Sequence, residues 1–233
     1  MPLLHNEIAR LDDHDIIGSV NKAQIVEEFR DHRVLFILRT RTPNQLSEMV
    51  ATIWQAGGRF VEIAANTPDA FKVVSELRGM VPAGSYLGVG TICSVEQADR
   101  AVEAGGTFAV MPICCQSVVT RLRDRGLMTI VGASTPTEIF NARGTGADFV
   151  KVFPAQSPQY IRTVRGPFPD IPLVAVGGVT KSDAIKYLNA GCAGVAVGSS
   201  FFATHFRSDG SFDADEVKAE VRAIVRVCDL RMT

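Results

Sequence analysis

Three charged residues interrupt or end runs of the sequence that are otherwise apolar. Lys151 lies in DFVKVF (148–153), Glu62 lies in FVEIA (60–64), and Arg39 ends VLFILR (34–39). A charge that is buried without a partner is costly, so each of these residues needs a chemical or structural reason. We therefore take them first as candidates for chemistry.

Lys151 has the setting of a nucleophilic amine. Strand alternation places Phe149, Lys151 and Phe153 on one face of their run. If this aromatic face points into a protein interior, the apolar surroundings disfavour the ammonium form and lower the pKa of Lys151, so that the neutral amine can attack a ketone. The alternative is a lysine whose stem lies along the wall while its amine reaches solvent or a fixed carboxylate.

Glu62 is the second charge in a buried run, and alternation groups it with Phe60 and Ala64. An interior carboxylate could accept and return protons during carbinolamine formation, dehydration and the carbon-carbon bond step. It could equally form a structural ion pair with Lys151. Both hypotheses predict that Glu62 and Lys151 face each other.

Arg39 and Thr91 each end an apolar run and could hold a substrate carboxylate. The guanidinium of Arg39 suits bidentate recognition of a carboxylate or phosphate, although exposed arginines are common at such places and Arg41 is close by. Thr91 closes GVGT (88–91), where Cys93 stands in place of the third glycine of a dinucleotide-binding fingerprint. We therefore reject a dinucleotide site and take Thr91 as a hydroxyl donor.

Two glycine-containing turns are candidates for phosphate binding. Gly177-Gly178 and Gly198-Ser199 directly follow the seventh and eighth predicted strands. In α/β barrels, the loops at these places often bind phosphate through backbone N–H groups and the N-terminus of a short helix. The alternative is that tight strand-to-helix turns use glycine in any case.

The elements that position these residues alternate between strand and helix. Short β-branched runs recur eight times from residue 33 onward, separated by amphipathic segments that open near Ser or Thr and close on Gly. The eight units predict an α/β fold, a single (β/α)8 TIM barrel over residues 33–233, in preference to an open doubly wound sheet. Residues 1–32 form a predicted N-terminal helical extension that includes VNKAQIVEEFRDH. The predicted strands are VLFILR (34–39), FVEIA (60–64), YLGVG (86–90), FAVMP (108–112), MTIVG (128–132), DFVKVF (148–153), PLVAVG (172–177) and GVAVG (194–198).

The composition excludes several classes of function. With 46% hydrophobic residues, 21% charged residues and a net charge of -1, the chain has the profile of a soluble globular protein, and neither nucleic acid nor a membrane is an expected partner. The start of the chain has no signal-peptide pattern, so we expect a cytoplasmic protein. The five cysteines have no zinc-finger spacing and none of the four histidines ends a predicted strand, so we expect free thiols, no metal and no cofactor.

Together these segments resemble one family, the 2-keto-3-deoxy-6-phosphogluconate (KDPG) and 4-hydroxy-2-oxoglutarate (KHG) aldolases with their 6-phosphogalactonate relatives. The resemblance runs from about residue 33 to 202. It rests on ILR (37–39), VEI (61–63), GVGT (88–91), FVKVFPA (149–155), VGGV (176–179) and VGS (197–199), of which the last four together are specific.

The resemblance implies a metal-independent class I aldolase, a homotrimer whose substrate is a small sugar acid phosphate. In this family pattern Lys151 forms the Schiff base with pyruvate and Glu62 is the general acid/base. Thr91 and an arginine hold the pyruvyl carboxylate. Gly177, Gly178, Gly198 and Ser199 hold the phosphate, and Phe153 shapes the wall beside the lysine.

Two departures from the family pattern concern the substrate. Asn66 stands where the phosphogluconate branch carries an arginine, which transfers the carboxylate contact to Arg39, as in the phosphogalactonate branch. Pro112 is followed by Ile113-Cys114-Cys115 in place of a permissive turn, so the pocket rim has a different shape. Asn66 and Pro112 are therefore candidate substrate contacts.

We expect cleavage of KDPG to pyruvate and glyceraldehyde 3-phosphate, with KHG cleavage to pyruvate and glyoxylate as a second reaction. Alternatives that use the same lysine are 6-phosphogalactonate aldolase and oxaloacetate decarboxylase. A phosphate-binding barrel isomerase or synthase would use the glycine turns without needing Lys151, as would a barrel that binds a sugar phosphate and has lost catalysis.

Overall fold

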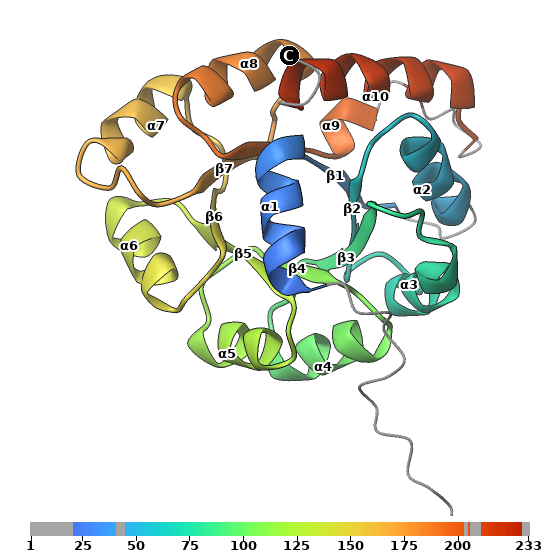
Figure 1. The fold of residues 1–233 in the computed structure, drawn as a ribbon, viewed down its shortest axis with the longest axis horizontal. Coiled ribbons are helices and arrows are strands. Elements are labelled where there is room, and N and C mark those ends of the chain that lie inside the picture. The colour runs from blue at the N-terminus through green and yellow to red at the C-terminus, as the bar shows by residue number, and fades with distance from the viewer. Residues whose placement is uncertain (1–20, 41–44, 203–204, 206–210, 230–233) are drawn as a thin grey trace, which may run out of the picture.

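A computed structural model of the chain describes residues 21–40, 45–202, 205 and 211–229. The first 20 residues of the predicted N-terminal extension lie outside this range. Eight parallel strands form a closed barrel in sequence order, in which β8 pairs with β1 (Figure 1). This confirms the predicted (β/α)8 barrel. The strands are β1 (Val34–Leu38), β2 (Phe60–Ala64), β3 (Tyr86–Gly90), β4 (Phe108–Met111), β5 (Met128–Ala133), β6 (Phe149–Val152), β7 (Leu173–Val176) and β8 (Gly194–Val197).

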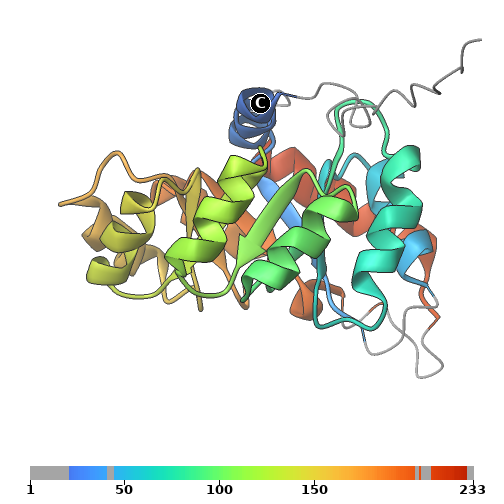
Figure 2. The same cartoon turned by 90° about the horizontal axis from the view of Figure 1, so that it is seen from below.

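Helices surround the barrel, and one helix covers its end. Figure 1 shows α1 lying across the opening of the barrel, and Figure 2 shows the same helix at one end when the barrel is turned on its side. The helix α10 packs between α8 and α2. The helices are α1 (Lys22–His32), α2 (Leu46–Gln55), α3 (Ala70–Leu77) with a 3-10 turn at Arg78–Met80, α4 (Val95–Glu103), α5 (Gln116–Asp124), α6 (Pro136–Gly144), α7 (Pro158–Arg165), α8 (Lys181–Asn189), α9 (Ser199–Phe202) and α10 (Ala214–Cys228).

Hydroxyl side chains cap several of the helices that follow the strands. The Ser94 and Ser157 hydroxyls accept backbone N–H bonds at the starts of α4 and α7. Thr135 and Glu138 form a reciprocal capping box at the start of α6. Such caps satisfy backbone donors that a helix leaves without partners in its first turn. The Ser and Thr signals in the sequence thus mark real helix starts.

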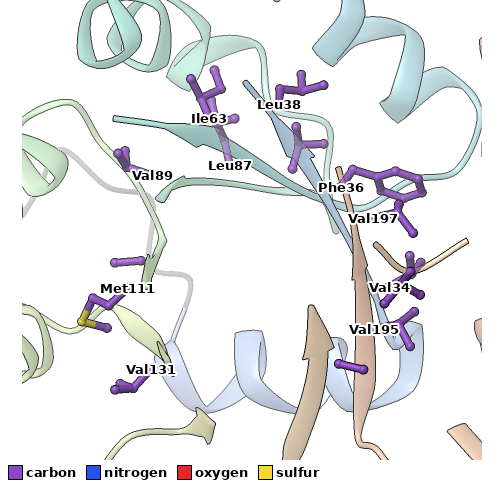
Figure 3. Close-up of a cluster of buried hydrophobic side chains, with 14 of the residues drawn as sticks. Val34, Phe36, Leu38, Ile63, Leu87, Val89, Met111, Val131, Val195 and Val197 are labelled. Atoms are coloured by element: carbon purple, nitrogen blue, oxygen red, sulfur yellow. The ribbon is translucent and has the colours of Figure 1, made fainter. Parts of the chain in front are cut away.

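The outward faces of the strands form the larger part of the core. Val34, Phe36 and Leu38 alternate along β1 and meet the helix layer, as do Ile63 of β2 and Val89 of β3 (Figure 3). All five side chains are at most 2% exposed. This layer fixes the strand faces, because a shift by one residue would turn every side chain to the opposite side.

The inward faces form a second cluster, which is aromatic toward the end covered by α1. Phe29 of α1 packs edge-on against Phe60 and Phe149, with ring centroids 5.1 and 4.8 Å apart. Phe60 also stacks on Tyr86 and lies near Phe108. These rings close one end of the barrel interior and leave the carboxyl ends of the strands for the candidate site.

Candidate active site

Glu62 and Lys151 both point into the barrel, as strand alternation predicts. Each follows a fully buried aromatic residue of the inner cluster by two positions, Phe60 on β2 and Phe149 on β6. Glu62 is 2% exposed and Lys151 is 6% exposed. The aromatic layer beneath them therefore keeps water away from two ionisable groups in the same interior.

Burial shifts the pKa of each group in the direction that favours its neutral form. Loss of hydration raises the pKa of Glu62 to about 7, against opposing effects of the Lys151 and Arg39 cations. Loss of hydration is also the largest cause that lowers the pKa of Lys151; the Arg39 cation lowers it further, while Glu62 and Cys93 raise it. Near neutral pH the site can therefore hold both a proton acceptor and a proton donor.

Glu62 and Lys151 interact electrostatically without forming a close ion pair. Among the described residues, the ion pairs within 4.0 Å do not include one between these two side chains. The Oε2 atom of Glu62 is buried and has no hydrogen-bond partner. An unpaired carboxylate oxygen beside an amine is poorly explained by a structural ion pair, and it is suited to a substrate or a reacting water.

Arg39 and Thr91 meet at the mouth of the barrel, as their positions after β1 and β3 predict. A guanidinium N–H of Arg39 donates to the Thr91 hydroxyl over 3.1 Å. Thr91 has a φ of 60°, which places a β-branched residue in the left-handed region. That conformation is rare for threonine and clusters at functional sites. Together the two side chains present N–H and O–H donors, and the Arg39 cation also acts on Lys151.

Phe153 and Pro112 shape the walls around the lysine. The amine of Lys151 lies 5.2 Å from the centroid of the Phe153 ring, a cation–π distance. The same ring lies against Gly177, where a Cβ atom would be 3.2 Å away. The Pro112 carbonyl lies so close to Gly132 that a Cβ atom on Gly132 would clash with it. Gly132 is the residue of β5 that pairs with Lys151. Phe153 thus lies beside Lys151, and Pro112 lies beside the residue that pairs with Lys151.

The candidate phosphate turns lie at the ends of β7 and β8. Gly177 and Gly178 have φ angles of 99° and 72°, which only glycine adopts readily. A Cβ atom on Gly198 would contact Ile37, and the Gly198 carbonyl accepts the backbone N–H of Phe201 in α9. Ser199 begins α9, and its side chain lies outside the described residues. The backbone arrangement therefore agrees with an anion site, whose occupant the chain alone does not identify.

Asn66 differs from the other candidates because its side chain is exposed in the loop after β2. Its neighbour Thr67 is 3% exposed, and the Thr67 hydroxyl accepts the backbone N–H of Thr40, next to Arg39. Sequence reasoning missed Thr67, and also Cys93, whose thiol acts on the charge of Lys151. The available signal was position, because each residue follows the end of a strand by three positions.

Two further findings concern metal ions and membranes. Within the described ranges, no group of three or more His, Cys, Asp or Glu side chains could hold a metal ion. None of the helices in the described part of the chain is long and apolar enough to cross a membrane.

Comparison with known proteins identifies relatives over most of the chain. The family model for KDPG and KHG aldolase matches residues 25–219. A probable 2-dehydro-3-deoxy-6-phosphogalactonate aldolase of Rhizobium meliloti (strain 1021) is 32% identical over 72% of this chain and 81% of its own length. The 2-dehydro-3-deoxy-6-phosphogalactonate aldolase of Escherichia coli (strain K12) is 33% identical over 72% of this chain and 84% of its own.

A solved structure described as native KDPGal is similar to this chain in fold and sequence. It superposes with a TM-score of 0.75 at 29% identity, over 83% of this chain and 93% of that one. The structure comparison thus supports the same fold, and the sequence comparisons cover most of the same chain.

Proposed function

Because this chain belongs to the KDPG and KHG aldolase family, we propose that it is a class I aldolase that cleaves a 2-keto-3-deoxy-6-phospho sugar acid through a Schiff base on Lys151. The products are pyruvate and glyceraldehyde 3-phosphate. The observation that carries the proposal is the pair inside the barrel: a lysine with a lowered pKa and a carboxyl group whose pKa is raised to about 7.

Lys151 supplies the nucleophile. Its neutral amine adds to the C2 ketone and forms a carbinolamine, which loses the C2 oxygen as water to give an imine. The protonated imine withdraws electrons, so the C3–C4 bond breaks when the C4 hydroxyl loses its proton. This releases the aldehyde and leaves an enamine, which takes a proton at C3. Addition of water to the resulting imine then frees pyruvate and the amine.

Glu62 moves the protons in these steps. In its protonated form it gives a proton to the departing C2 oxygen, and as a carboxylate it takes the proton from the C4 hydroxyl, directly or through one water. A pKa near 7 populates both forms at neutral pH, which both directions of transfer need. The free Oε2 atom is the acceptor available for this role.

The remaining residues bind the two ends of the substrate. Arg39 and Thr91, which already share a hydrogen bond, hold the carboxylate beside C2. The backbone of Gly177, Gly178 and Gly198, with Ser199 at the start of α9, receives the phosphate. Phe153 and Pro112 border the carbon chain between them, and exposed Asn66 contacts the substrate only when it turns inward.

The preferred epimer in this proposal is the galactonate. Phosphogluconate was the first expectation from the sequence, but the two relatives at 32% and 33% identity both carry the phosphogalactonate name. Asn66 supports the same choice, because the arginine of the phosphogluconate branch is missing from its place. We expect a higher kcat/KM for 2-keto-3-deoxy-6-phosphogalactonate than for KDPG; the reverse order would restore the phosphogluconate assignment.

Borohydride trapping tests the mechanism. The protein is incubated with pyruvate and borohydride, and peptides are then analysed by mass spectrometry. We expect a reduced adduct on Lys151 and none on Lys181 or Lys186, which form surface ion pairs outside the barrel and serve as internal controls. Lys151→Ala should lose turnover; wild-type turnover in that variant, or an adduct on another lysine alone, would contradict the proposal.

A further inference from the structure

Two glycines of β3, Gly88 and Gly90, lie in the GVGT segment and face the barrel interior. Neither has a φ in the left-handed region, so a residue with a side chain could adopt the backbone at both positions. The residue of this segment that does take a left-handed φ is Thr91. Conformational freedom therefore does not explain these glycines, and the space that they leave open is the remaining reason.

The two glycines leave space for different neighbours. A Cβ atom built on Gly90 would lie closer than 3.0 Å to the Oε1, Cδ and Cγ atoms of Glu62, a separation that real Cβ atoms essentially never show. A Cβ atom on Gly88 would also lie closer than 3.0 Å to ring atoms of Phe108, although not as close as the Gly90 atom to Glu62. Gly88 thus makes room for an aromatic ring of the inner core, and Gly90 makes room for the carboxyl group beside Lys151.

We propose that Gly90 is a positioning residue for the aldolase reaction, because its missing side chain provides the space in which the Glu62 carboxyl group sits. This inference rests on the proposed function, since it takes Glu62 as the acid/base. Any side chain at position 90 would force the Glu62 carboxyl group into another rotamer. Backbone movement offers little relief, because Gly90 pairs with Ala64 on β2 and its carbonyl accepts the N–H of Ala65 over 2.7 Å.

A displaced carboxyl group would lose the environment that gives it its reactivity. Burial is the largest cause of the raised pKa of Glu62, whereas the cations of Lys151 and Arg39 lower this pKa. A new rotamer changes all three effects at once. It also changes how Glu62 acts on Lys151. Gly90→Ala should therefore affect proton transfer more strongly than substrate binding.

The first test follows the carboxyl group itself and needs no substrate. In protein labelled with 13C at the glutamate carboxyl carbon, the Glu62 signal is assigned with Glu62→Gln and titrated by NMR. We expect the midpoint near pH 7 to persist in Gly88→Ala and to move by one pH unit or more in Gly90→Ala. An unchanged midpoint in Gly90→Ala would overturn the proposal, whether or not the protein proves to be an aldolase.

The second test is kinetic. We expect Gly90→Ala to lower kcat at least 10-fold with less than a 3-fold change in KM, and to shift the pH profile of kcat. In a Glu62→Gln background, Gly90→Ala should lower kcat less than 3-fold, because the side chain at position 62 can no longer exchange a proton. Equal losses in both backgrounds, or a similar loss in Gly88→Ala, would contradict a role through Glu62.

A suppressor variant keeps the proposal testable if Gly90→Ala does not fold. Glu62→Ala removes the atoms that the new methyl group would meet, so the double variant Glu62→Ala/Gly90→Ala should fold and show a Tm close to that of Glu62→Ala. Failure of the double variant to fold when Glu62→Ala alone folds would overturn the proposal. An absence of pyruvate adduct on wild-type Lys151 would instead contradict the proposed function alone.

Discussion

At the scale of single residues, Glu62 and Lys151 owe their shifted pKa values to the same buried interior. The aromatic residues two positions before each of them close the barrel below, so both charges are poorly hydrated. Alternation along two strands predicts these faces from the sequence. The separation of the two groups and the free Oε2 atom depend on the barrel's closure, which local patterns do not encode.

Replacement of Glu62 with Gln should slow catalysis. The amide has nearly the shape of the carboxyl group but cannot exchange a proton, so we expect kcat to fall by about 100-fold or more. The step in the pH profile near pH 7 should disappear with it, because this is the pH at which Glu62 titrates. Steady-state assays between pH 5 and pH 9 measure both effects, and an unchanged kcat would remove Glu62 from the acid/base role.

The same substitution should change how stability depends on pH. Folding raises the pKa of Glu62 from 4.5 to about 7, so the unfolded state releases this proton first. The stabilisation is complete below about pH 4.5 and is lost as pH rises through 7. At about 1.4 kcal/mol per pKa unit, the wild type should lose on the order of 3 kcal/mol over this range from Glu62 alone. Urea unfolding at pH 5 and pH 8 should show a smaller difference for Glu62→Gln.

The cysteines should differ in reactivity. The pKa of Cys115 is lowered by the Ser117 hydroxyl and by backbone N–H groups at the start of α5, whereas burial raises the pKa values of Cys192 and Cys228 to about 12. Because the thiolate is the reactive form, iodoacetamide at pH 7.5 should label Cys115 well before Cys192 and Cys228. Peptide mass spectrometry over time measures the order, with urea-unfolded protein as the control for equal access.

At the scale of elements, most of the fold can be predicted from the sequence, because each strand and helix carries its own signal. Apolar runs in the sequence mark all eight strands, and Ser or Thr caps mark helix starts such as that of α6. The loops are less predictable. The left-handed φ of Thr91 and the outward position of Asn66 follow from contacts between neighbouring loops, and a residue's type alone does not specify them.

The helix α1 contributes to stability through Phe29, which lies one turn after Ile25 on the buried face of the helix. Phe29 is fully buried against Phe60 and Phe149. Replacement with Ala should lower the free energy of unfolding by about 3 to 5 kcal/mol, as is usual for a buried aromatic residue. Phe140 of α6, which is 61% exposed, provides the matched control, and Phe140→Ala should cost less than about 1 kcal/mol. Equal losses in urea unfolding would contradict a structural role for α1.

At the scale of the whole molecule, the two ends of the described chain meet. His32, the last residue of α1, lies with its Nδ1 atom 3.0 Å from a carboxylate oxygen of Asp229, which follows α10. Both side chains are buried. Their separation of 197 positions in the sequence explains why no local pattern predicts this contact. The trimer implied by the family resemblance stays a prediction, since it concerns contacts between chains.

Loss of the Asp229 carboxylate should destabilise the whole fold. The backbone N–H of Arg59 donates to Nε2 of His32, so in the neutral ring Nδ1 carries the proton and donates it to Asp229. Asp229→Ala leaves that buried donor without this acceptor, and we expect a loss of about 2 to 4 kcal/mol. Glu220→Ala breaks the exposed ion pair between Glu220 of α10 and Lys181 of α8, and it should cost less than about 1 kcal/mol.

The two variants should also differ in which part of the chain they loosen. Because Asp229 joins the end of α10 to the end of α1, its loss should increase amide hydrogen exchange in both helices, which lie far apart in the sequence. Glu220→Ala should affect α10 and α8 at most. Exchange that rises only in α10 after Asp229→Ala would mean that this carboxylate stabilises only the helix before it and does not join α10 to α1.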